Sequence, residues 1–549
     1  MVRRREFLGS MAALASQAPE TRKRRPNVLL IISDDQGFGD LSIHGNLLLK
    51  TPNIDRIGRE GVHFTQFHAS PVCSPTRASL MTGRYNYRTG VVDTYLGRSM
   101  MYPDEVTMPE LLSKAGYRTG IFGKWHLGDN YPLRPIDQGF QTALVHRGGG
   151  IGQPSDIPGG SYFDPMLLEN GRVVKKQGYC TDVFFDSAME FIDKNLESPW
   201  FAYVAPNAPH DPLQVDDRYV HPFRRPDIDE RTAKVYGMVR NLDENVGRML
   251  AKLDERQIAK DTVVLFMTDN GPQRQRYNAG MRGLKGSVYQ GGIRVPLLMR
   301  WSEGLAAGRV VDRIAAHIDL LPTILNLCGA PPAANIDGKS LYPLINNSPV
   351  RINQDPWPDR SLFFQWHRGD EPVAWRNAAV RTQRWKLVNS TELYDLEADP
   401  GEANDVAGKY PQVVARMRRD YDRWFNDVCS TRGFAPPRIV LDGPENPVTL
   451  TRQDWRGPKA GWAPDSLGHW EVSVERAGKY EVVVKGGPLD ADGSLSLSIG
   501  QASAILPLKK GETEWKAHLS LGNGPMEVMA KLEVSGEEFG PTFVDIRRL

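Results

Sequence analysis

Cysteine is scarce in this chain, since only Cys73, Cys180, Cys328 and Cys429 occur among 549 residues. Cysteines so few and so far apart exclude a disulfide framework as the basis of the fold. No Cys-x-x-Cys pair suggests a zinc site. Whether the last three cysteines pair with one another stays open at this level.

Long apolar runs and an excess of one charge are also missing. No stretch of about eighteen apolar residues occurs, so no membrane span is expected. The 68 basic and 66 acidic residues give a formal net charge of +2, which offers no support for a nucleic-acid partner. A hydrophobic content of 40% is typical of a globular protein, and the length predicts two or three packed units.

The first residues have the features of a twin-arginine export signal. Arg4-Arg5 precedes Phe7-Leu8 and a short apolar stretch at 11–15, with small residues suited to cleavage nearby. We therefore assign residues 1–25 to an export signal and expect a periplasmic or extracellular protein. A disordered basic tail is the alternative interpretation.

Three apolar runs have the continuous hydrophobicity of buried parallel strands, and each is followed by polar side chains that can carry chemistry. The runs are 27–32, 200–205 and 262–267, followed by Asp34-Asp35, by His210 and by Asp269-Asn270. Helical patterns separate the runs, which predicts an α/β fold with a wound, mostly parallel sheet. Ligands of such sheets bind at the carboxyl ends of the strands, so these polar groups are expected to share one site.

The pattern changes after residue 350. Residues 351–434 combine a predicted hairpin with an amphipathic helix and are expected to form a smaller α+β unit beside the catalytic unit at 26–350. Short strand-like runs between glycine-rich turns predict a β-sandwich over 435–549. The sandwich contains tryptophans that could form a carbohydrate platform, although core packing is favoured for most: Trp455, Trp462, Trp470 and Trp515.

Oxygen ligands are concentrated at two of the strand ends. Asp34, Asp35 and Asp269 supply carboxylates and Asn270 an amide oxygen. Ligands of this kind suit Ca2+ or Mg2+, whereas Zn2+ would favour His or Cys. Either pair alone could equally cap a helix, but two pairs on matching strand ends favour a metal.

Cys73 lies between two prolines, with Arg77 one helical turn onward. A fixed cation beside a cysteine favours reactivity, whereas a lone cysteine is more often a small buried hydrophobe. The segment Cys73-Ser74-Pro75-Thr76-Arg77 resembles the signature of the type I sulfatases, in which the cysteine is oxidised to Cα-formylglycine. Residues 116–128 are similar to the second sulfatase signature, and the resemblance covers roughly residues 26 to 430.

The resemblance implies an alkaline-phosphatase-like fold with helices on both faces of the sheet. It also implies a Ca2+ site, with Mg2+ the less favoured ion, and a formylglycine-generating enzyme as a transient partner. The ligands implied are Asp34, Asp35, Asp269, Asn270 and the modified Cys73.

Catalytic roles follow from the same resemblance. Lys124 and Lys285 would bind the sulfate oxygens, and Arg77 would orient the modified residue. His210 would protonate the leaving alcohol, and His126 would be the base in the step that releases sulfate.

Substrate contacts are less well marked. His146-Arg147 and His367-Arg368 lie on glycine-containing loops and could line a sugar subsite, with loop packing an equal alternative. The expected substrate is a sulfated carbohydrate or an aryl sulfate. Two other functions stay open: a phosphonate monoester or phosphodiester hydrolase, and a glycan-binding protein in which Cys73 stays a thiol. Deleting the sandwich is expected to spare small aryl substrates.

Overall fold

The computed structural model describes residues 25–346 and 357–549. The predicted export signal, apart from Arg25, and the predicted boundary at residue 350 lie outside these residues. Within the described ranges no helix is long and apolar enough to cross a membrane. All four cysteines are described, and none of them forms a disulfide.

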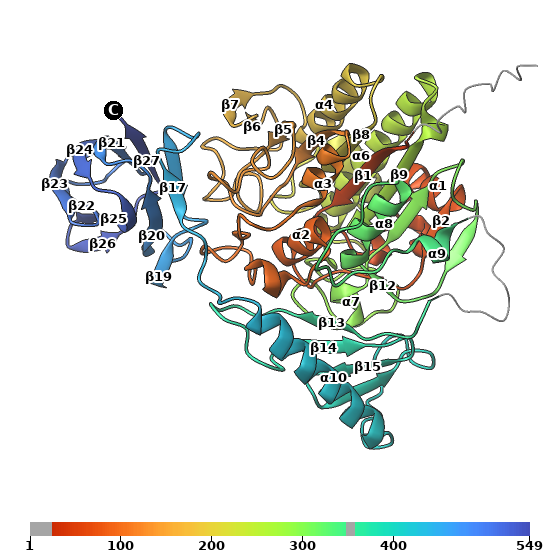
Figure 1. Cartoon of the computed structure of the whole chain (residues 1–549). Coiled ribbons are helices and arrows are strands. Elements are labelled where there is room, and N and C mark those ends of the chain that lie inside the picture. Colours follow the sequence, from red (N-terminus) through yellow and green to blue (C-terminus); the bar gives the residue numbers. More distant parts are fainter. Residues whose placement is uncertain (1–24, 347–356) are drawn as a thin grey trace, which may run out of the picture.

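One large mixed sheet forms the centre of the molecule (Figure 1). Its strands run in the order β11-β2-β10-β9-β1-β8-β4-β5-β6-β7, and the neighbours β9, β1, β8, β4 and β5 are parallel. The strand bounds are β1 Asn27–Ser33, β2 Val62–Phe64, β4 Arg118–Gly123, β5 Thr142–Val145, β6 Met166–Glu169, β7 Arg172–Lys175, β8 Trp200–Ala205, β9 Thr262–Thr268, β10 Leu297–Arg300 and β11 Arg309–Val311. The predicted α/β fold is therefore confirmed, with its parallel strands in the middle of the sheet.

Helices cover both faces of this sheet, which explains why β1 is apolar along its whole length. Val28, Leu30 and Ile32 belong to a core shared with α2, α3 and α8. Leu29 and Ile31 point to the opposite face and pack with α1, α4 and α6. The helix bounds are α1 Pro52–Arg59, α2 Cys73–Thr82, α3 Met108–Lys114, α4 Cys180–Lys194, α6 Glu230–Glu255 and α8 Leu320–Leu327. A side chain on either face of β1 is thus removed from water.

A smaller antiparallel sheet and one long helix lie below the large sheet in Figure 1. The strands are β13 Leu362–Gln365, β14 Ala378–Arg381, β15 Trp385–Val388 and β16 Glu392–Asp395, and the helix is α10 Pro411–Ser430. The apolar face predicted for α10 is buried against this sheet, as Val414, Met417, Tyr421, Trp424 and Val428. Tyr85 and Val288 belong to the same core, so the two parts pack together.

The C-terminal strands form two facing sheets, as predicted for a β-sandwich. One runs β17-β20-β25-β22-β23, with β19 and β26 alongside, and the other runs β18-β27-β21-β24. Their bounds are β17 Ile439–Leu441, β18 Val448–Thr451, β19 Arg456–Lys459, β20 Leu467–Val474, β21 Gly478–Lys485, β22 Gly493–Ile499, β23 Ala502–Leu508, β24 Glu514–Leu521, β25 Gly524–Val534, β26 Glu537–Phe539 and β27 Phe543–Arg548. Trp455, Trp470 and Trp515 are buried in the core between the sheets, as favoured from the sequence.

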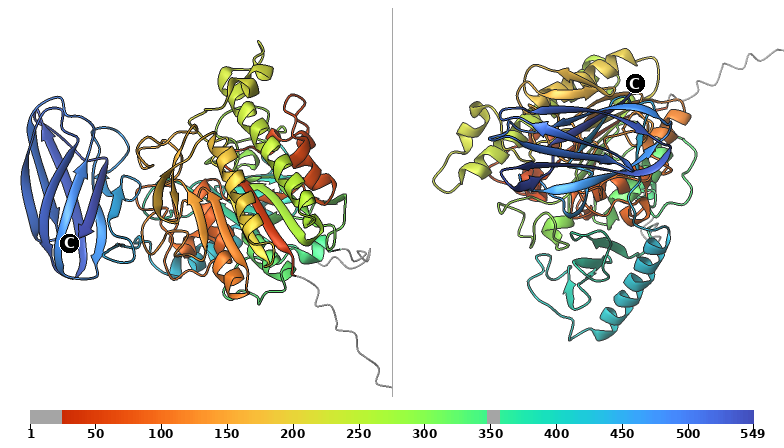
Figure 2. Two further views of the ribbon diagram at one scale, coloured as in Figure 1. Left: turned by 90° about the horizontal axis from the view of Figure 1, so that it is seen from above. Right: turned by 90° about the vertical axis from the view of Figure 1, so that its left-hand side faces the viewer.

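The sandwich lies beside the large sheet and faces the loops around residues 90–160 (Figure 2). Met100 and Leu133 from these loops are members of the sandwich core cluster. The Trp462 ring meets Tyr95 edge-on, with 5.2 Å between ring centroids. The C-terminal unit is therefore packed against the part of the chain that carries the candidate site.

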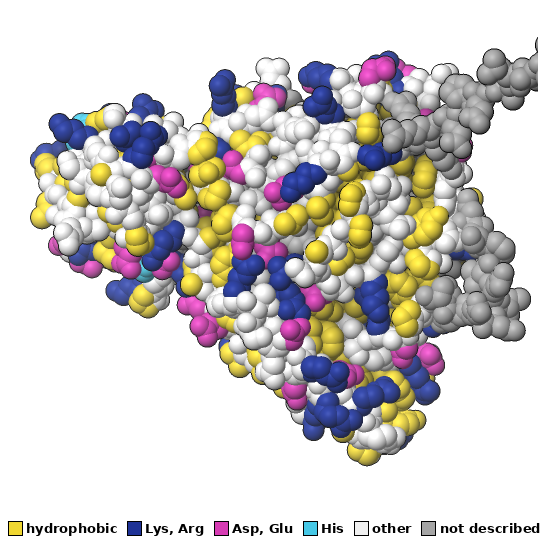
Figure 3. Space-filling view, in the orientation of Figure 1, with side chains coloured by type: hydrophobic (Ala, Val, Ile, Leu, Met, Phe, Trp, Pro, Cys, Tyr) yellow, Lys and Arg dark blue, Asp and Glu magenta, His cyan; other side chains and the backbone are white. Residues whose placement is uncertain are grey.

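Charged side chains of both signs are interspersed over the face shown in Figure 3. This distribution agrees with a formal net charge of +2.

Candidate active site

The parallel strands bring the predicted residues to one edge of the sheet. Asp34 and Asp35 directly follow β1, Asp269 and Asn270 follow β9, and His210 lies on the loop after β8. Ser33 at the end of β1 pairs with Thr268 at the end of β9, so the acidic pairs are adjacent in space. The structure thus joins groups that are more than two hundred residues apart in the chain.

A fourth strand, which the sequence did not predict, delivers the lysine and histidine of the second signature. Gly123 at the end of β4 is paired with Ala205 at the end of β8. Lys124 and His126 follow immediately, and the Nζ of Lys124 lies 2.6 Å from Oδ2 of Asp34, with both side chains fully buried. The signal missed was the short apolar run before Lys124, which the glycines at 120 and 123 interrupt.

Several oxygens at the strand ends are buried without a partner. Oδ1 of Asp34, Oδ2 of Asp35 and Oδ1 of Asn270 accept no hydrogen bond from any residue in the described part of the chain. The amide of Asn270 donates to Oδ1 of Asp35 over 2.9 Å, which leaves its own oxygen free. Buried unpaired oxygens are costly, and carboxylate and amide oxygens are the ligands that a hard dication takes. The residues present therefore fit a calcium or magnesium ion.

His210 belongs to the same cluster. One ligand atom each from Asp34, Asp35 and His210 lie within 4.8 Å of one another. Nε2 of His210 is 3.7 Å from Oδ2 of Asp35, while Nδ1 is 2.7 Å from the carbonyl of Asp211. Because that carbonyl can only accept, Nδ1 carries the ring proton and Nε2 faces the site.

The charges in the site balance one another. Asp34, Asp35 and Asp269 face the cations Arg77, Lys124 and Lys285, three against three. Arg77 lies 2.8 Å from Oδ2 of Asp269, and Lys285 lies 2.5 Å from Oδ1 of Asp35. A bound dication would leave the site with an excess of two positive charges, which suits an anionic ester.

The carboxylates titrate differently because their neighbours differ. Burial and the nearby charge of Asp34 raise the pKa of Asp269 to about 6, against the influence of Arg77. Burial also favours the neutral form of Asp35, but Lys285 and His210 outweigh it and lower its pKa. Asp35 is therefore charged at neutral pH, whereas Asp269 can exchange a proton near neutrality.

Cys73 begins helix α2 and is 3% exposed. Burial raises the pKa of its thiol, despite the opposing charges of Lys124 and Lys285. An unmodified Cys73 is therefore held as the thiol, which is a poor nucleophile. Arg77, one turn along the same helix, donates to the carbonyl of Lys124 over 3.1 Å and so links α2 to β4.

Tyr203 is a polar residue of the site that the sequence did not single out. It lies on β8, and its hydroxyl is 3.4 Å from a guanidinium nitrogen of Arg77. Arg77 thereby contacts groups that follow or lie on four different strands, β1, β4, β8 and β9. A single hydroxyl in the otherwise apolar run at 200–205 was the available signal.

The predicted substrate residues separate into two groups. His146 is buried close to the site, and burial, together with the charges of Lys124, Arg77 and His210, lowers its pKa to about 3. Its Nε2 accepts no hydrogen bond from any described residue. Arg147 instead lies among carboxylates at the contact with the sandwich, where burial raises the pKa of Asp129 to about 6 and also raises the pKa of Glu445, although the charge of Arg147 opposes both shifts.

His367 and Arg368 lie on an exposed loop of the smaller unit. Arg368 is 2.7 Å from Asp93 and lies over the rings of Tyr95 and Trp366, at 4.4 Å and 5.1 Å from their centroids. His367 accepts a hydrogen bond from the backbone amide of Val373 over 2.8 Å, and this bond holds the ring within its own loop. The structure therefore places Arg368 nearer to the loops around the site than His367.

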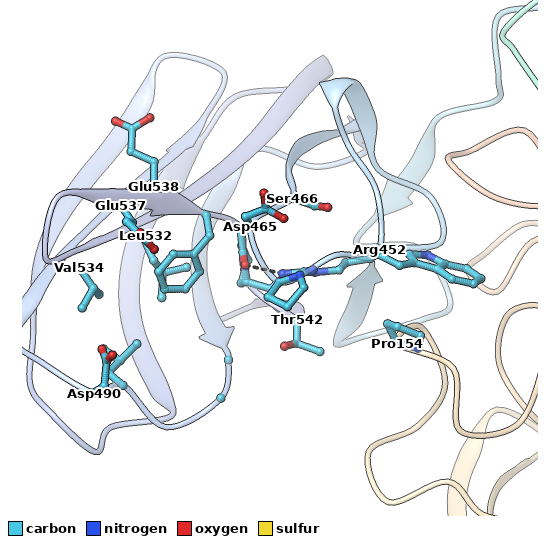
Figure 4. A pocket seen from close by; sticks show the side chains of 18 of the residues that line it. Pro154, Arg452, Asp465, Ser466, Asp490, Leu532, Val534, Glu537, Glu538 and Thr542 are labelled. Carbon is cyan, nitrogen blue, oxygen red and sulfur yellow. Dashed lines mark hydrogen bonds between the residues drawn. The ribbon is translucent and has the colours of Figure 1, made fainter. Parts of the chain in front are cut away.

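A cavity of about 1250 Å3 lies in the sandwich, and Pro154 from outside the sandwich also lines it (Figure 4). Arg452 lines this cavity, but its guanidinium already donates hydrogen bonds to three backbone carbonyls, those of Ala463, Gly540 and Pro541. The carboxylates that line it outnumber the remaining cation, Lys459: Asp465, Asp490, Glu537 and Glu538. An acidic cavity of this kind is unsuited to a sulfate ester.

Comparisons with known proteins agree with this geometry. A family model described as "Sulfatase" matches residues 26–330, and one described as "N-sulphoglucosamine sulphohydrolase, C-terminal" matches residues 284–424. Human N-acetylgalactosamine-6-sulfatase is 31% identical over 429 residues, covering 72% of this chain and 77% of that protein. Human arylsulfatase A is 30% identical over 464 residues, covering 72% and 87%. The crystal structure of Ps i-CgsB in complex with k-i-k-neocarrahexaose has a TM-score of 0.66 at 30% identity and covers 75% of this chain and 95% of that one.

Proposed function

The chain belongs to the sulfatase family and is a sulfuric ester hydrolase, and from that premise we propose that it removes sulfate from sulfated carbohydrates. Sugars are favoured as substrates because relatives include an N-acetylgalactosamine-6-sulfatase and a protein solved with k-i-k-neocarrahexaose bound. One observation carries the proposal: three carboxylates, three cations and Cys73 converge in a single buried site at the strand ends.

Two groups that the chain acquires are part of this proposal. Oxidation of Cys73 to formylglycine would supply, as its hydrate, an oxygen nucleophile in place of a thiol. Calcium would make the hydrate oxygen easier to deprotonate and would offset the negative charge of the sulfate. Asp34, Asp35, Asp269 and Asn270 would hold the ion together with residue 73. Because Cys73 is 3% exposed, the enzyme that generates formylglycine must act before the chain closes over it.

The side chains around residue 73 would then divide the remaining work. Arg77 orients the modified residue through its fixed contacts with Asp269 and the Lys124 carbonyl. Asp269, which directly follows β9, is assigned as the base that accepts the proton of the nucleophile. Lys124 and Lys285 bind the sulfate oxygens and oppose the charge that develops on them.

Proton transfer to the leaving alcohol is assigned to His210 with support from Lys285. Burial lowers the pKa of His210 to about 4, although Asp35 opposes this effect. Its Nε2 is therefore unprotonated before substrate binds, and an arriving sulfate anion would raise its proton affinity. His126 is assigned as the base for sulfate release.

The test of this function is a comparison of matched aryl esters and defined sulfated sugars. We expect kcat/KM for sulfate esters to exceed that for the matched phosphate esters by at least about tenfold. The phosphonate or phosphodiester alternative is not favoured, because the relatives above are sulfatases. A dominant phosphate activity in the purified protein, absent from the Cys73→Ala variant, would contradict the proposal.

Calcium binding is expected to stabilise the protein more strongly as pH rises. Asp269 has a pKa raised to about 6 in the metal-free site, so below that pH calcium must displace its proton. The stability that protonated Asp269 contributes to the metal-free fold is also lost as pH rises through about 6. The increase in Tm on adding calcium should therefore be larger at about pH 7.5 than at about pH 5, as measured by scanning calorimetry. An increase independent of pH would count against Asp269 as a ligand.

The remaining parts of the proposal concern export and organisation. We propose that residues 1–25 direct export to the periplasm or the outside of the cell by the twin-arginine route. We also propose the division into a catalytic unit at 26–350, a smaller unit at 351–434 and a sandwich at 435–549. Hydrophobic clusters centred on the large sheet, on the α10 unit and on the C-terminal strands support this division.

A further inference from the structure

The C-terminal sandwich contributes a side chain at the active site. Gln453 lies between β18 and β19 and is 2% exposed. Its Nε2 is 3.4 Å from Nε2 of His126, the histidine assigned above as a base. Neither family model reaches this residue, since together they end at residue 424.

Three groups fix the amide of Gln453. Its Nε2 donates to the carbonyl of Thr94 over 2.8 Å and to the hydroxyl of Ser99 over 2.9 Å. Its Oε1 accepts from the hydroxyl of Ser155 over 3.4 Å. The main chain is held as well, because the amide of Gly97 donates to the Gln453 carbonyl over 2.9 Å.

The carbonyl of Thr94 connects Gln453 to His126. It lies 2.8 Å from Nε2 of His126 and also accepts from Gln453. A carbonyl cannot donate, so Nε2 of His126 must carry the ring proton. Nε2 of Gln453 and Nε2 of His126 are therefore both donors, and both donate to the Thr94 carbonyl.

The opposite ring nitrogen is consequently available for chemistry. Nδ1 of His126 is buried and accepts no hydrogen bond from any residue that the structure describes. The ring packs against the backbone of Gly149, where a Cβ would lie 2.8 Å from Cε1 of His126. The backbone of His126 has a φ of +64°, a conformation that its surroundings must enforce. Burial and the neighbouring charges of Lys124, Arg77 and His146 lower the pKa of the ring, which keeps it neutral.

We propose that Gln453 is a positioning residue of the active site, which holds the Thr94 carbonyl so that the His126 ring keeps its orientation, with Nε2 protonated and Nδ1 unprotonated and free for catalysis. The sandwich is then part of the catalytic structure and not a separable accessory. This inference rests on the proposed sulfatase mechanism and replaces the expectation that deleting the sandwich spares small substrates.

Substitution of Gln453 by methionine tests the proposal, because methionine has a similar length and volume but no donor. In Gln453→Met, kcat for a sulfate ester should fall about 10- to 100-fold, the scale of a misplaced catalytic group, with KM changed by less than about threefold. A crystal structure of the variant in its unmodified Cys73 form should show the His126 ring displaced from the Thr94 carbonyl. That second measurement does not depend on activity.

Arg456→Met is the matched control. Arg456 comes from the same segment of the sandwich and donates to the carbonyl of Leu96 over 2.8 Å, two residues from Thr94, but it does not contact His126. Its kcat should stay within about twofold of the parent. An equal loss in both variants would overturn the proposal, because the loop and not His126 would then be what Gln453 supports.

A second variant makes the test independent of whether the methionine variant folds. Gln453→Glu keeps the size of the side chain without its donor and should lose activity like Gln453→Met, which covers the case that the methionine variant does not fold. Parent-like kcat with an undisplaced ring in either variant would overturn the inference. If the parent protein hydrolyses no sulfate ester, the proposed function fails, while the crystal structures still show whether Gln453 positions His126.

Discussion

Replacing Cys73 by alanine is expected to abolish turnover of sulfate esters while leaving the fold intact. The loss should be about 10^4-fold or more, the scale on which enzymes lose activity with their covalent nucleophile. The substitution removes only one small polar group at the start of α2, which costs about 1 kcal/mol of stability. Steady-state kinetics and thermal unfolding of the same preparation measure the two effects.

Cys180→Ala is the matched control for this variant. Cys180 is also a buried cysteine at the first position of a helix, α4, but it packs in the core beneath the opposite face of the sheet. Its substitution should cost similar stability and leave kcat unchanged. A Cys73→Ala protein that keeps the activity of Cys180→Ala would refute a nucleophile at residue 73.

Mass spectrometry of the peptide containing Cys73 separates the enzyme from an unmodified glycan-binding protein. The aldehyde form is lighter than the thiol, and protein from its own host should contain it. An active preparation with only the thiol would be unexpected, because burial raises the pKa of Cys73 and leaves the thiol unreactive.

Replacing Asp269 by asparagine is expected to lower kcat by about 10^2- to 10^4-fold, because one change removes a general base and a metal ligand. Added calcium should not restore activity. The isosteric amide can still accept from Arg77, which lies 2.8 Å from Oδ2 of Asp269. The loss would therefore report on charge and proton transfer more than on side-chain position.

The same variant should lose activity but not thermal stability. Burial and Asp34 disfavour the charge of Asp269, as its pKa of about 6 indicates. In the absence of calcium, Asp269→Asn should therefore unfold at the parent temperature or above it near pH 7. A marked decrease in Tm without calcium would show that the ion pair with Arg77 outweighs this repulsion.

Asp243→Asn provides the comparison for a buried carboxylate outside the site. Burial raises the pKa of Asp243 to about 7, and it accepts from the backbone amides of Asn53 and Ile54. This variant should change the Tm of the protein but keep kcat within about twofold of the parent value. Equal kcat losses in Asp243→Asn and Asp269→Asn would point to a general effect of burying an amide.

Local sequence was sufficient for the elements that surround the site. The strands at 200–205 and 262–267 were predictable because a strand covered by helices on both faces must be apolar throughout. The apolar face of α10 was predictable from its helical spacing for the same reason. The acidic pairs after β1 and β9 were recognised as one site because parallel strands end at a common edge.

The strand β4 shows where local pattern fails. Its glycines interrupt the apolar run, and Gly123 has its place because a side chain there would meet the Ala205 carbonyl at 2.0 Å. That close approach is a property of the neighbouring strand. The sequence around Lys124 therefore carried a family signature but no clear strand signal.

The sequence by itself determined the fold class, the acidic and amide side chains proposed as ligands at the strand ends, and the cysteine that is proposed to be modified. Only the tertiary structure decided which charges pair, that Asp35 and Asp269 titrate differently, and that Gln453 reaches His126 from another unit. The pattern of buried residues within one helix or strand can be read from consecutive residues, because each element must bury its own apolar side chains. The hydrogen bond between Gln453 and Thr94 depends on how the sandwich packs against the unit of the large sheet. The spacing of residues along the chain does not predict that packing.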